Sequence, residues 1–193
     1  MRLEVPEGKK KILLHCCCAP CSGAVVECLV QNGLSPVLFF SNSNITPREE
    51  YELRRSELER YANVYGLQTV DDDYDHEAWL DCTVRRDPSL AAEPERGRRC
   101  AECFYLRLRR AAQFAADQGF EVLTTTLASS RWKSLEQVDE AGRRACEGLP
   151  VLWWGQNWRK GGLQPRRSEI IREQNFYNQT FCGCEFSEKH DSK

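Results

Sequence analysis

The chain has 193 residues, of which 41% are hydrophobic and 29% are charged, and its formal net charge is −2. This composition indicates a globular protein with one domain over 1–193, and it excludes a generally basic nucleic-acid-binding protein. No apolar run is long enough to span a bilayer and residues 1–11 are charged, so we expect a cytoplasmic protein with no membrane partner. In that reducing compartment, its 11 cysteines indicate metal ligands or catalytic thiols rather than structural disulfides.

The first predicted elements surround a cysteine-rich turn. Residues 11–15 form a short apolar run typical of a buried strand, and a helical pattern covers 23–32, with Ser22 as its N-cap. The turn between them contains Cys16, Cys17, Cys18 and Cys21. Proteins of the α/β class place ligands at such turns, and the positive end of a helix lowers the pKa of a thiol there. The turn therefore predicts half of a metal or redox site.

Strand and helix patterns then alternate along the chain. Further strands are predicted at 36–41, 67–70, 120–126 and 150–154. Helices are predicted at 47–65, after the acidic segment 71–80, and at 100–119, 134–148 and 168–174. Capping boxes mark two of the helix starts, Thr46 to Glu49 with Pro47 at the first helical position, and Ser134 to Gln137. The alternation predicts a Rossmann-like α/β fold, a parallel sheet flanked by helices, with a C-terminal extension over 155–193.

Eight of the cysteines form three groups. These are Cys16, Cys17, Cys18 and Cys21; Cys100 and Cys103; and Cys182 and Cys184. The isolated Cys28, Cys82 and Cys146 are expected to be structural. A Cys-x-x-Cys pair at a helix start, joined by two thiolates from the turn, gives four sulfur ligands that fit zinc or an iron–sulfur cluster. Adjacent cysteines reach separate corners of a four-iron cluster more readily than one small ion, which favours [4Fe–4S] over zinc.

The Cys182-Gly183-Cys184 sequence has two interpretations. Two cysteines separated by glycine can form a strained disulfide that is easily reduced, which suits a two-electron redox role. They can equally be a pair of metal ligands, which together with Cys21 would hold a single additional iron. The chemistry of these residues leaves both interpretations open.

A basic segment over 159–172 follows three tryptophans. Its cations are Arg159, Lys160, Arg166, Arg167 and Arg172, against the single acid Glu169. Basic side chains interleaved with aromatic ones suit an RNA backbone with unstacked bases. The alternative is an ordinary solvated face beside core tryptophans.

Five motifs occur in an order that is typical of one known family. They are Leu-Leu-His-Cys-Cys-Cys-Ala-Pro-Cys (13–21), Asn-Ile-Thr-Pro-Arg-Glu-Glu-Tyr (44–51), Glu-Pro-Glu-Arg-Gly-Arg-Arg-Cys-Ala-Glu-Cys-Phe-Tyr-Leu-Arg (93–107), Thr-Thr-Thr-Leu (124–127) and Tyr-Asn-Gln-Thr-Phe-Cys-Gly-Cys (177–184). The chain resembles the QueH family of epoxyqueuosine reductases over nearly its whole length. It departs from the family pattern at Ser130-Arg131-Trp132, where a Ser-Pro-aromatic run is usual.

The resemblance implies a tRNA-modifying oxidoreductase whose fold is similar to the nucleotide-binding sandwich of tRNA thiolation enzymes. It implies reduction of epoxyqueuosine to queuosine at the wobble position of tRNA, with an unknown electron donor. By resemblance, the ligands of a [4Fe–4S] cluster are Cys17, Cys18, Cys100 and Cys103. Cys182 and Cys184 are then the redox-active pair, and Cys21 is left open as a ligand for an additional iron or an activated thiol.

Two other classes compete with this interpretation. A sulfur-transfer or adenylating tRNA enzyme of related fold needs a glycine-rich phosphate loop after the first strand, which this chain lacks. A non-enzymatic zinc-binding module would use the clustered thiolates only structurally.

Two further site predictions accompany the reductase interpretation. The basic segment leads into the Cys182 and Cys184 tail, so we expect tRNA to bind at Arg159, Lys160, Arg166 and Arg167. His15 is a candidate proton donor beside the cysteines, although a histidine at a strand end is as often a satisfied core residue.

Overall fold

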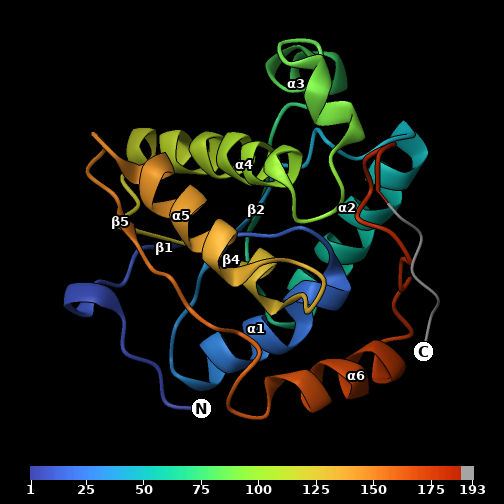
Figure 1. The fold of residues 1–193 in the computed structure, drawn as a ribbon. Helices are drawn as coiled ribbons and strands as arrows, with labels where there is room; N and C mark the ends of the chain where they lie inside the picture. Colours follow the sequence, from blue (N-terminus) through green and yellow to red (C-terminus); the bar gives the residue numbers. More distant parts are fainter. Residues whose placement is uncertain (188–193) are drawn as a thin grey trace.

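A five-stranded parallel sheet forms the centre of the computed structural model, which describes residues 1–187 (Figure 1). Its strands are β1 (Ile12–His15), β2 (Val37–Phe40), β3 (Thr69–Asp71), β4 (Val122–Thr125) and β5 (Leu152–Trp153). They lie in the order β3–β2–β1–β4–β5. Every residue of β1 and β4 is buried, because helices cover both faces of the sheet, and this explains the continuous apolar runs of the sequence. The predicted α/β fold with a parallel sheet is confirmed.

Two helical layers enclose the sheet. The helices are α1 (Ala19–Gln31), α2 (Arg48–Val64), α3 (His76–Cys82), α4 (Arg98–Asp117), α5 (Leu135–Cys146) and α6 (Leu163–Glu173). The first packs against α2 and α6 on one side, and α4 packs along α5 on the other (Figure 1). Within residues 1–187, no helix is long and apolar enough to cross a lipid bilayer.

The two central strands send the chain to opposite faces of the sheet. His15 of β1 lies opposite Thr125 of β4 in the parallel register. The chain continues from β1 into α1 on one face and from β4 into α5 on the other. Such a divergence opens a crevice at the carboxyl ends of the strands, where α/β proteins bind their ligands. The cysteine turn after β1 therefore lies at this crevice.

The first helix begins earlier than its sequence pattern predicts. Cys18 is extended (φ −177°, ψ 162°) and is the N-cap residue, so α1 starts at Ala19 with Pro20 in its first turn. Ser22 is not the cap, because it lies inside the helix and its hydroxyl donates to the carbonyl oxygen of Cys18 at 2.8 Å. As a result, Cys21 belongs to the first turn of α1.

The two predicted capping boxes have different outcomes. At α2 the N-cap is Pro47, which follows a cis peptide bond and makes no side-chain cap, so the prediction there is wrong. At α5 the Ser134 hydroxyl accepts from the amide of Gln137, as predicted. The reciprocal bond is absent because the Gln137 side chain donates to the carbonyl oxygen of Arg96 at 2.7 Å.

The C-terminal part returns to the crevice along α2. Helix α6 begins at Leu163, earlier than the predicted 168, and the chain after it runs beside α2. There the Tyr177 hydroxyl donates to Glu50 at 2.9 Å. Residues 178–187, which we call the tail, then reach the carboxyl ends of the strands. The predicted extension over 155–193 also includes residues 188–193, which lie outside the described part of the chain.

Candidate active site

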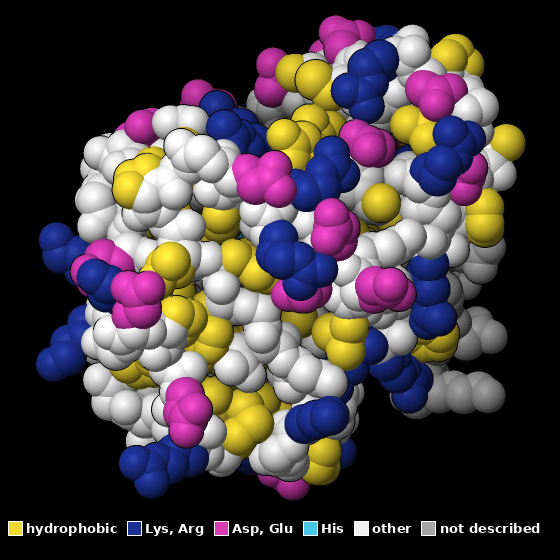
Figure 2. Space-filling model, turned by 60° about the vertical axis from the view of Figure 1, so that its left-hand side comes forward, with side chains coloured by type: hydrophobic (Ala, Val, Ile, Leu, Met, Phe, Trp, Pro, Cys, Tyr) yellow, Lys and Arg dark blue, Asp and Glu magenta, His cyan; other side chains and the backbone are white. Residues whose placement is uncertain are grey.

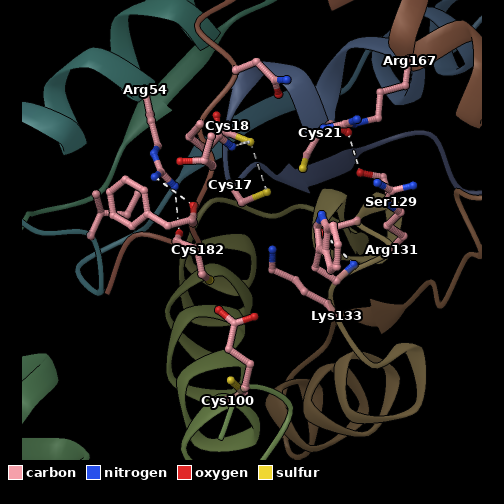
Figure 3. Close-up of a pocket in the computed structure, with 18 of the residues that line it drawn as sticks. Cys17, Cys18, Cys21, Arg54, Cys100, Ser129, Arg131, Lys133, Arg167 and Cys182 are labelled. Atoms are coloured by element: carbon pink, nitrogen blue, oxygen red, sulfur yellow. Dashed lines mark hydrogen bonds between the residues drawn. The ribbon is translucent and has the colours of Figure 1, made fainter. Parts of the chain in front are cut away.

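The crevice holds a cavity of about 220 Å³ (Figure 3). Residues 17–21 after β1 line one side, and residues 129–133 after β4 line another. The beginning of α4, the tail, residues of α6, and Ile45 with Arg54 of α2 form the rest of the lining. Segments that are distant in sequence thus meet where the topology of the sheet places a ligand site.

Three buried cysteines form a group that could bind a metal. The ligand atoms of Cys17, Cys18 and Cys21 all lie within 4.8 Å of one another, and each residue is at most 6% exposed. The extended backbone at Cys18 and the helical first turn at Cys21 bring these sulfur atoms together. Buried thiols converging on one point are the donor set of metal and metal-cluster sites, so the chemistry of this group fits such a ligand.

Hydrogen bonds fix this group from two directions. The hydroxyl of Thr126, directly after β4, accepts from the Cys17 amide at 3.1 Å and donates to the Cys17 sulfur at 3.6 Å. The tail contributes Gln179, whose Nε2 donates to the Cys18 sulfur at 2.7 Å. The sulfur atoms are therefore held by both the sheet and the tail.

Two cations favour the thiolate form of Cys21. Hydrogen bonds from Cys17 and Cys18, followed by the charges of Arg167 and Lys133, hold the pKa of the Cys21 thiol well below its usual range. Burial alone would lower the pKa of Lys133, but negative charge on the facing cysteines, Cys182 and Cys17 first, raises it instead. The Lys133 side chain extends into the cavity between these sulfur groups (Figure 3). A metal ligand must be deprotonated, and this electrostatic setting supports that state.

The remaining site cysteines form a second group across the cavity. Cys100, Cys103, Cys182 and Cys184 together line a small pocket of about 20 Å³. Cys100 and Cys182 also line the main cavity, where Figure 3 shows Cys100 facing Cys17 from the opposite side. The ligand set that pairs Cys17 and Cys18 with the α4 cysteines therefore spans the cavity and stays a prediction.

The second group consists of thiols that are buried or partly buried. All 11 cysteines, which lie within the described residues, are free, so the predicted Cys182–Cys184 disulfide is not formed in this structure. Burial raises the pKa of Cys184, and it raises the pKa of Cys100 to about 11. The thiols of Cys100 and Cys184 are therefore in the protonated, reduced form near neutral pH when no metal is bound.

Two buried arginines hold the segment of the tail that contains Cys182 and Cys184. Arg54 donates to the carbonyl oxygens of Phe181 at 3.2 Å and Cys182 at 2.8 Å, and its guanidinium lies 5.1 Å from the Phe181 ring centre. Arg99 repeats this arrangement with Phe186, donating to its carbonyl at 3.1 Å and lying 5.2 Å from its ring. We call this pair of contacts the arginine clamp. It fixes the backbone on both sides of the two cysteines.

Gly183 fits a position that a larger residue would not. Its φ of +121° is accessible mainly to glycine, and its carbonyl accepts from the amide of Thr46 at 2.9 Å. An added Cβ would lie 2.9 Å from Ile45 Cγ1 and 3.1 Å from Arg54 Nη1. The glycine therefore allows the tail to dock closely.

His15 is a core residue that does not line the cavity. It is 0% exposed, with Nδ1 2.8 Å from the Thr125 hydroxyl and Nε2 3.1 Å from the Ser41 carbonyl oxygen. A carbonyl only accepts, so Nε2 carries the proton and Nδ1 accepts. Burial first, and the charge of Arg107 second, lower the His15 pKa to about 3. This arrangement favours the interpretation as a satisfied, neutral core histidine over that of a proton donor.

The predicted basic segment is divided among several roles. Arg159 donates to the carbonyl oxygens of Ser130 and Lys133, and Arg166 binds three carboxylates within 3.1 Å. Lys160 is exposed, and of the four predicted residues only Arg167 lines the cavity. The carboxylates on Arg166 come from Glu27, Glu169 and Glu173. Two of the four cations therefore have partners within the protein.

Sequence reasoning missed Lys133 and the arginine clamp. Lys133 comes a few residues after the predicted strand that ends at residue 126. Its expected place at the carboxyl edge of the sheet, where ligands bind, could therefore have identified it as a site residue. Arg54 offers no such signal, because it is one of many charges on α2 and its partner Cys182 is 128 residues away.

Comparison with known proteins identifies the family. The family model of the epoxyqueuosine reductase QueH matches residues 12–190. A protein of Histophilus somni named epoxyqueuosine reductase QueH is 44% identical over 193 residues, covering 100% of this chain and 78% of its own. Relatives of the same name from Haemophilus influenzae and Acinetobacter baylyi are each 42% identical, covering 100% and 97% of this chain and 77% and 84% of their own. The sulfur-lined crevice thus belongs to a sequence that matches one family over nearly its full length, and the chain is a member of the QueH family of epoxyqueuosine reductases.

Proposed function

We propose that this protein reduces epoxyqueuosine to queuosine in tRNA, at the wobble position. The observation that carries the proposal is the cavity with thiols on opposite sides, Cys17, Cys18 and Cys21 facing Cys100 and Cys182. The relatives named epoxyqueuosine reductase support the same reaction. Neither a purely structural zinc module nor an adenylating enzyme is favoured, since a structural metal site is closed and no glycine-rich phosphate loop follows β1.

The reaction needs two electrons and two protons. Removal of the epoxide oxygen breaks two carbon–oxygen bonds, forms the carbon–carbon double bond of the product and releases water. Two thiols supply both electrons and both protons when they become a disulfide. Cys182 and Cys184 are the proposed source, and an external reductant, still unidentified, then restores their thiols.

The proposed cofactor is a [4Fe–4S] cluster held by Cys17, Cys18, Cys100 and Cys103. Bound there, it supplies Lewis acidity and single-electron transfer. The converging thiols of Cys17 and Cys18, with Cys21 beside them, support metal binding on this side of the cavity. Cys21 remains the proposed ligand of an additional iron.

Other side chains of the cavity orient and stabilise the reacting groups. Lys133 places an ammonium where negative charge develops on the departing oxygen. We propose that Nζ, rather than His15, relays one of the two protons to this oxygen and is then reprotonated by the proton that a thiol releases. The Arg54 contact holds the main chain of Cys182 during the reaction. For tRNA, we retain Arg167 from the predicted surface, because it lines the cavity.

Anaerobic turnover tests the proposal. The purified protein, incubated with epoxyqueuosine-containing tRNA and a reductant, should yield queuosine by nucleoside mass spectrometry. The Cys184→Ser variant should retain the iron of the wild type and lose turnover, whereas Cys28→Ser, which changes a buried cysteine of α1, should retain both. A colourless zinc protein, or an iron-loaded wild type that makes no queuosine, would contradict the assignment. Turnover by Cys184→Ser would contradict the redox role alone.

A further inference from the structure

The cavity is strongly electropositive. Its six cationic side chains are Arg54, Arg96, Arg107, Arg131, Lys133 and Arg167, and its acidic one is Glu95. On the face drawn in Figure 2, by contrast, basic and acidic side chains are interspersed. A concave site with one sign of charge attracts ligands of the opposite sign, so this cavity favours an anionic ligand.

Three of these cations have no carboxylate partner in the described part of the chain. Within residues 1–187, no carboxylate forms an ion pair with Arg96, Arg131 or Arg167, in contrast to Arg54, which pairs with Glu50 at 2.6 Å. Arg96 and Arg131 are exposed and Arg167 is half-buried, with its Nε atom buried and without a hydrogen-bond partner. Guanidinium groups in this state are suited to bind phosphate, which accepts two parallel hydrogen bonds.

An exposed indole lies beside these cations. Trp132 lines the cavity and is 43% exposed, and the Arg131 guanidinium lies 4.9 Å from its ring centre. By contrast, the tryptophans near the predicted basic segment, Trp154 and Trp158, are 4% and 1% exposed and belong to the core. An aromatic side chain at the surface next to unpaired arginines is typical of sites that bind unstacked nucleic-acid bases.

The loop that carries this indole is held in place. Arg96 donates to the carbonyl oxygens of Arg131 at 3.1 Å and Trp132 at 3.0 Å. Arg159 donates to the carbonyl oxygens of Ser130 and Lys133 on either side of them. A binding loop that is ordered beforehand loses less conformational entropy when its ligand binds.

We propose that Arg96, Arg131, Trp132 and Arg167, the cavity rim, bind the anticodon loop of the substrate RNA. Trp132 stacks on an unpaired base, and Arg131 and Arg167 contact the phosphates on either side of the nucleotide that enters the cavity. Arg96, whose Nε and Nη2 atoms hold the loop, adds its positive charge to this site. This inference rests on the proposed function for the nature of the ligand. It moves the RNA surface from the 159–172 segment to the cavity rim, with Arg167 common to both and Arg159 acting as a support of the loop.

Binding of a fluorescein-labelled anticodon stem-loop to the full-length protein tests the rim. Trp132→Ala should weaken binding about 5- to 100-fold, and Trp132→Phe should restore most of it, because base stacking on an aromatic ring contributes on that scale. Arg131→Ala should lower the slope of log Kd against log salt by about 0.7, the loss of one phosphate contact to a single strand. Arg2→Ala removes an exposed arginine outside the cavity lining and serves as the matched control.

The possible outcomes separate the rim from the proposed function. If folded Trp132→Ala and Arg131→Ala bind the stem-loop with unchanged affinity, the proposal that RNA binds at the cavity rim is overturned. It is also overturned if Lys160→Ala loses as much affinity as Arg131→Ala. If the wild type makes queuosine while Trp132→Ala retains the wild-type KM, the rim is wrong and the proposed function stands. If the wild type binds the stem-loop through the rim but never makes queuosine, the proposed function is wrong and the rim stands. Identical thermal unfolding of all variants confirms that they are folded.

Discussion

The arginine clamp predicts how Arg54→Met changes the stability of the protein and the exposure of Cys182. Arg54 is 3% exposed, pairs with the 11%-exposed Glu50 at 2.6 Å, and donates to two carbonyl oxygens of the tail. Loss of one partner from a buried ion pair costs about 3–5 kcal/mol when the surroundings stay fixed. For a chain of this length, each kcal/mol of lost stability lowers Tm by about 2–4 °C. If the tail stayed docked in the variant, Tm would therefore fall by roughly 6–20 °C.

In Arg54→Met, detachment of the tail costs less free energy than keeping it docked beside the unpaired groups. When the tail detaches, water hydrates the carbonyl oxygens of Phe181 and Cys182, and the tail no longer encloses Glu50. The loss of stability caused by Arg54→Met is then limited to the free energy that docks the tail. We therefore expect Tm to fall by less than about 6 °C. Alkylation of Cys182 should accelerate at least about tenfold, which corresponds to a 1.4 kcal/mol weaker docking, and turnover should fall in parallel.

Peptide mapping after timed alkylation measures Cys182 directly. Arg55→Met is the matched control, because Arg55 lies on the same helix and binds Glu52 at 2.9 Å and Asp71 at 2.7 Å, without contacting the tail. Unchanged alkylation and turnover in Arg54→Met would refute the clamp. An equal change in both variants would refute it too, because it would reflect a general loosening of α2.

Two further predictions concern the tail and the metal group. Gly183→Ala should raise the alkylation rate of the neighbouring cysteines and lower turnover, because its methyl group would lie 2.9 Å from Ile45 Cγ1; a rate equal to that of the wild type would contradict the close docking. Cys21→Ser and Cys100→Ser should each be compared with Cys28→Ser for iron and acid-labile sulfide per chain. The predicted cluster ligands require Cys100→Ser to lose cluster iron and sulfide while Cys21→Ser retains the sulfide and loses at most one additional iron. The reverse result would place Cys21, rather than Cys100, in the cluster.

The sheet could be predicted from sequence because parallel strands have a simple signature. Apolar runs at 11–15, 36–41 and 120–126 contain β1, β2 and β4, since helices bury both faces of these strands. The start of α1 was not predictable in the same way. The N-cap at Cys18 makes no side-chain capping bond, so the usual signal is missing, and Ser22 provided a misleading one.

The site was predictable only in part, and for a physical reason. Local spacing places Cys17, Cys18 and Cys21 together, because a turn into a helix holds residues close in sequence close in space. The opposite side of the cavity depends on tertiary docking, as in the contact between Arg54 and Cys182 across 128 positions. The basic segment could not be interpreted from sequence for the same reason. Arg166 pairs with Glu27, which is 139 positions away, so it is not available to bind RNA.

The cysteines of the β1–α1 turn and the Cys182 and Cys184 pair are positioned by different parts of the fold, so metal binding and turnover can be lost separately. The sulfur atoms of Cys17 and Cys21 are placed by the β1–α1 turn and by Thr126 at the end of β4, which belong to the sheet. Cys182 lies at the cavity, and Cys184 at the small pocket that shares Cys100 and Cys182 with it, only while Arg54 and Arg99 hold the tail. Detachment of the tail removes the proposed reductant and the Gln179 contact, but leaves the turn intact. A variant that weakens the clamp should therefore retain iron while it loses activity, whereas a variant of Cys17 or Cys18, the predicted cluster ligands in the turn, should lose both.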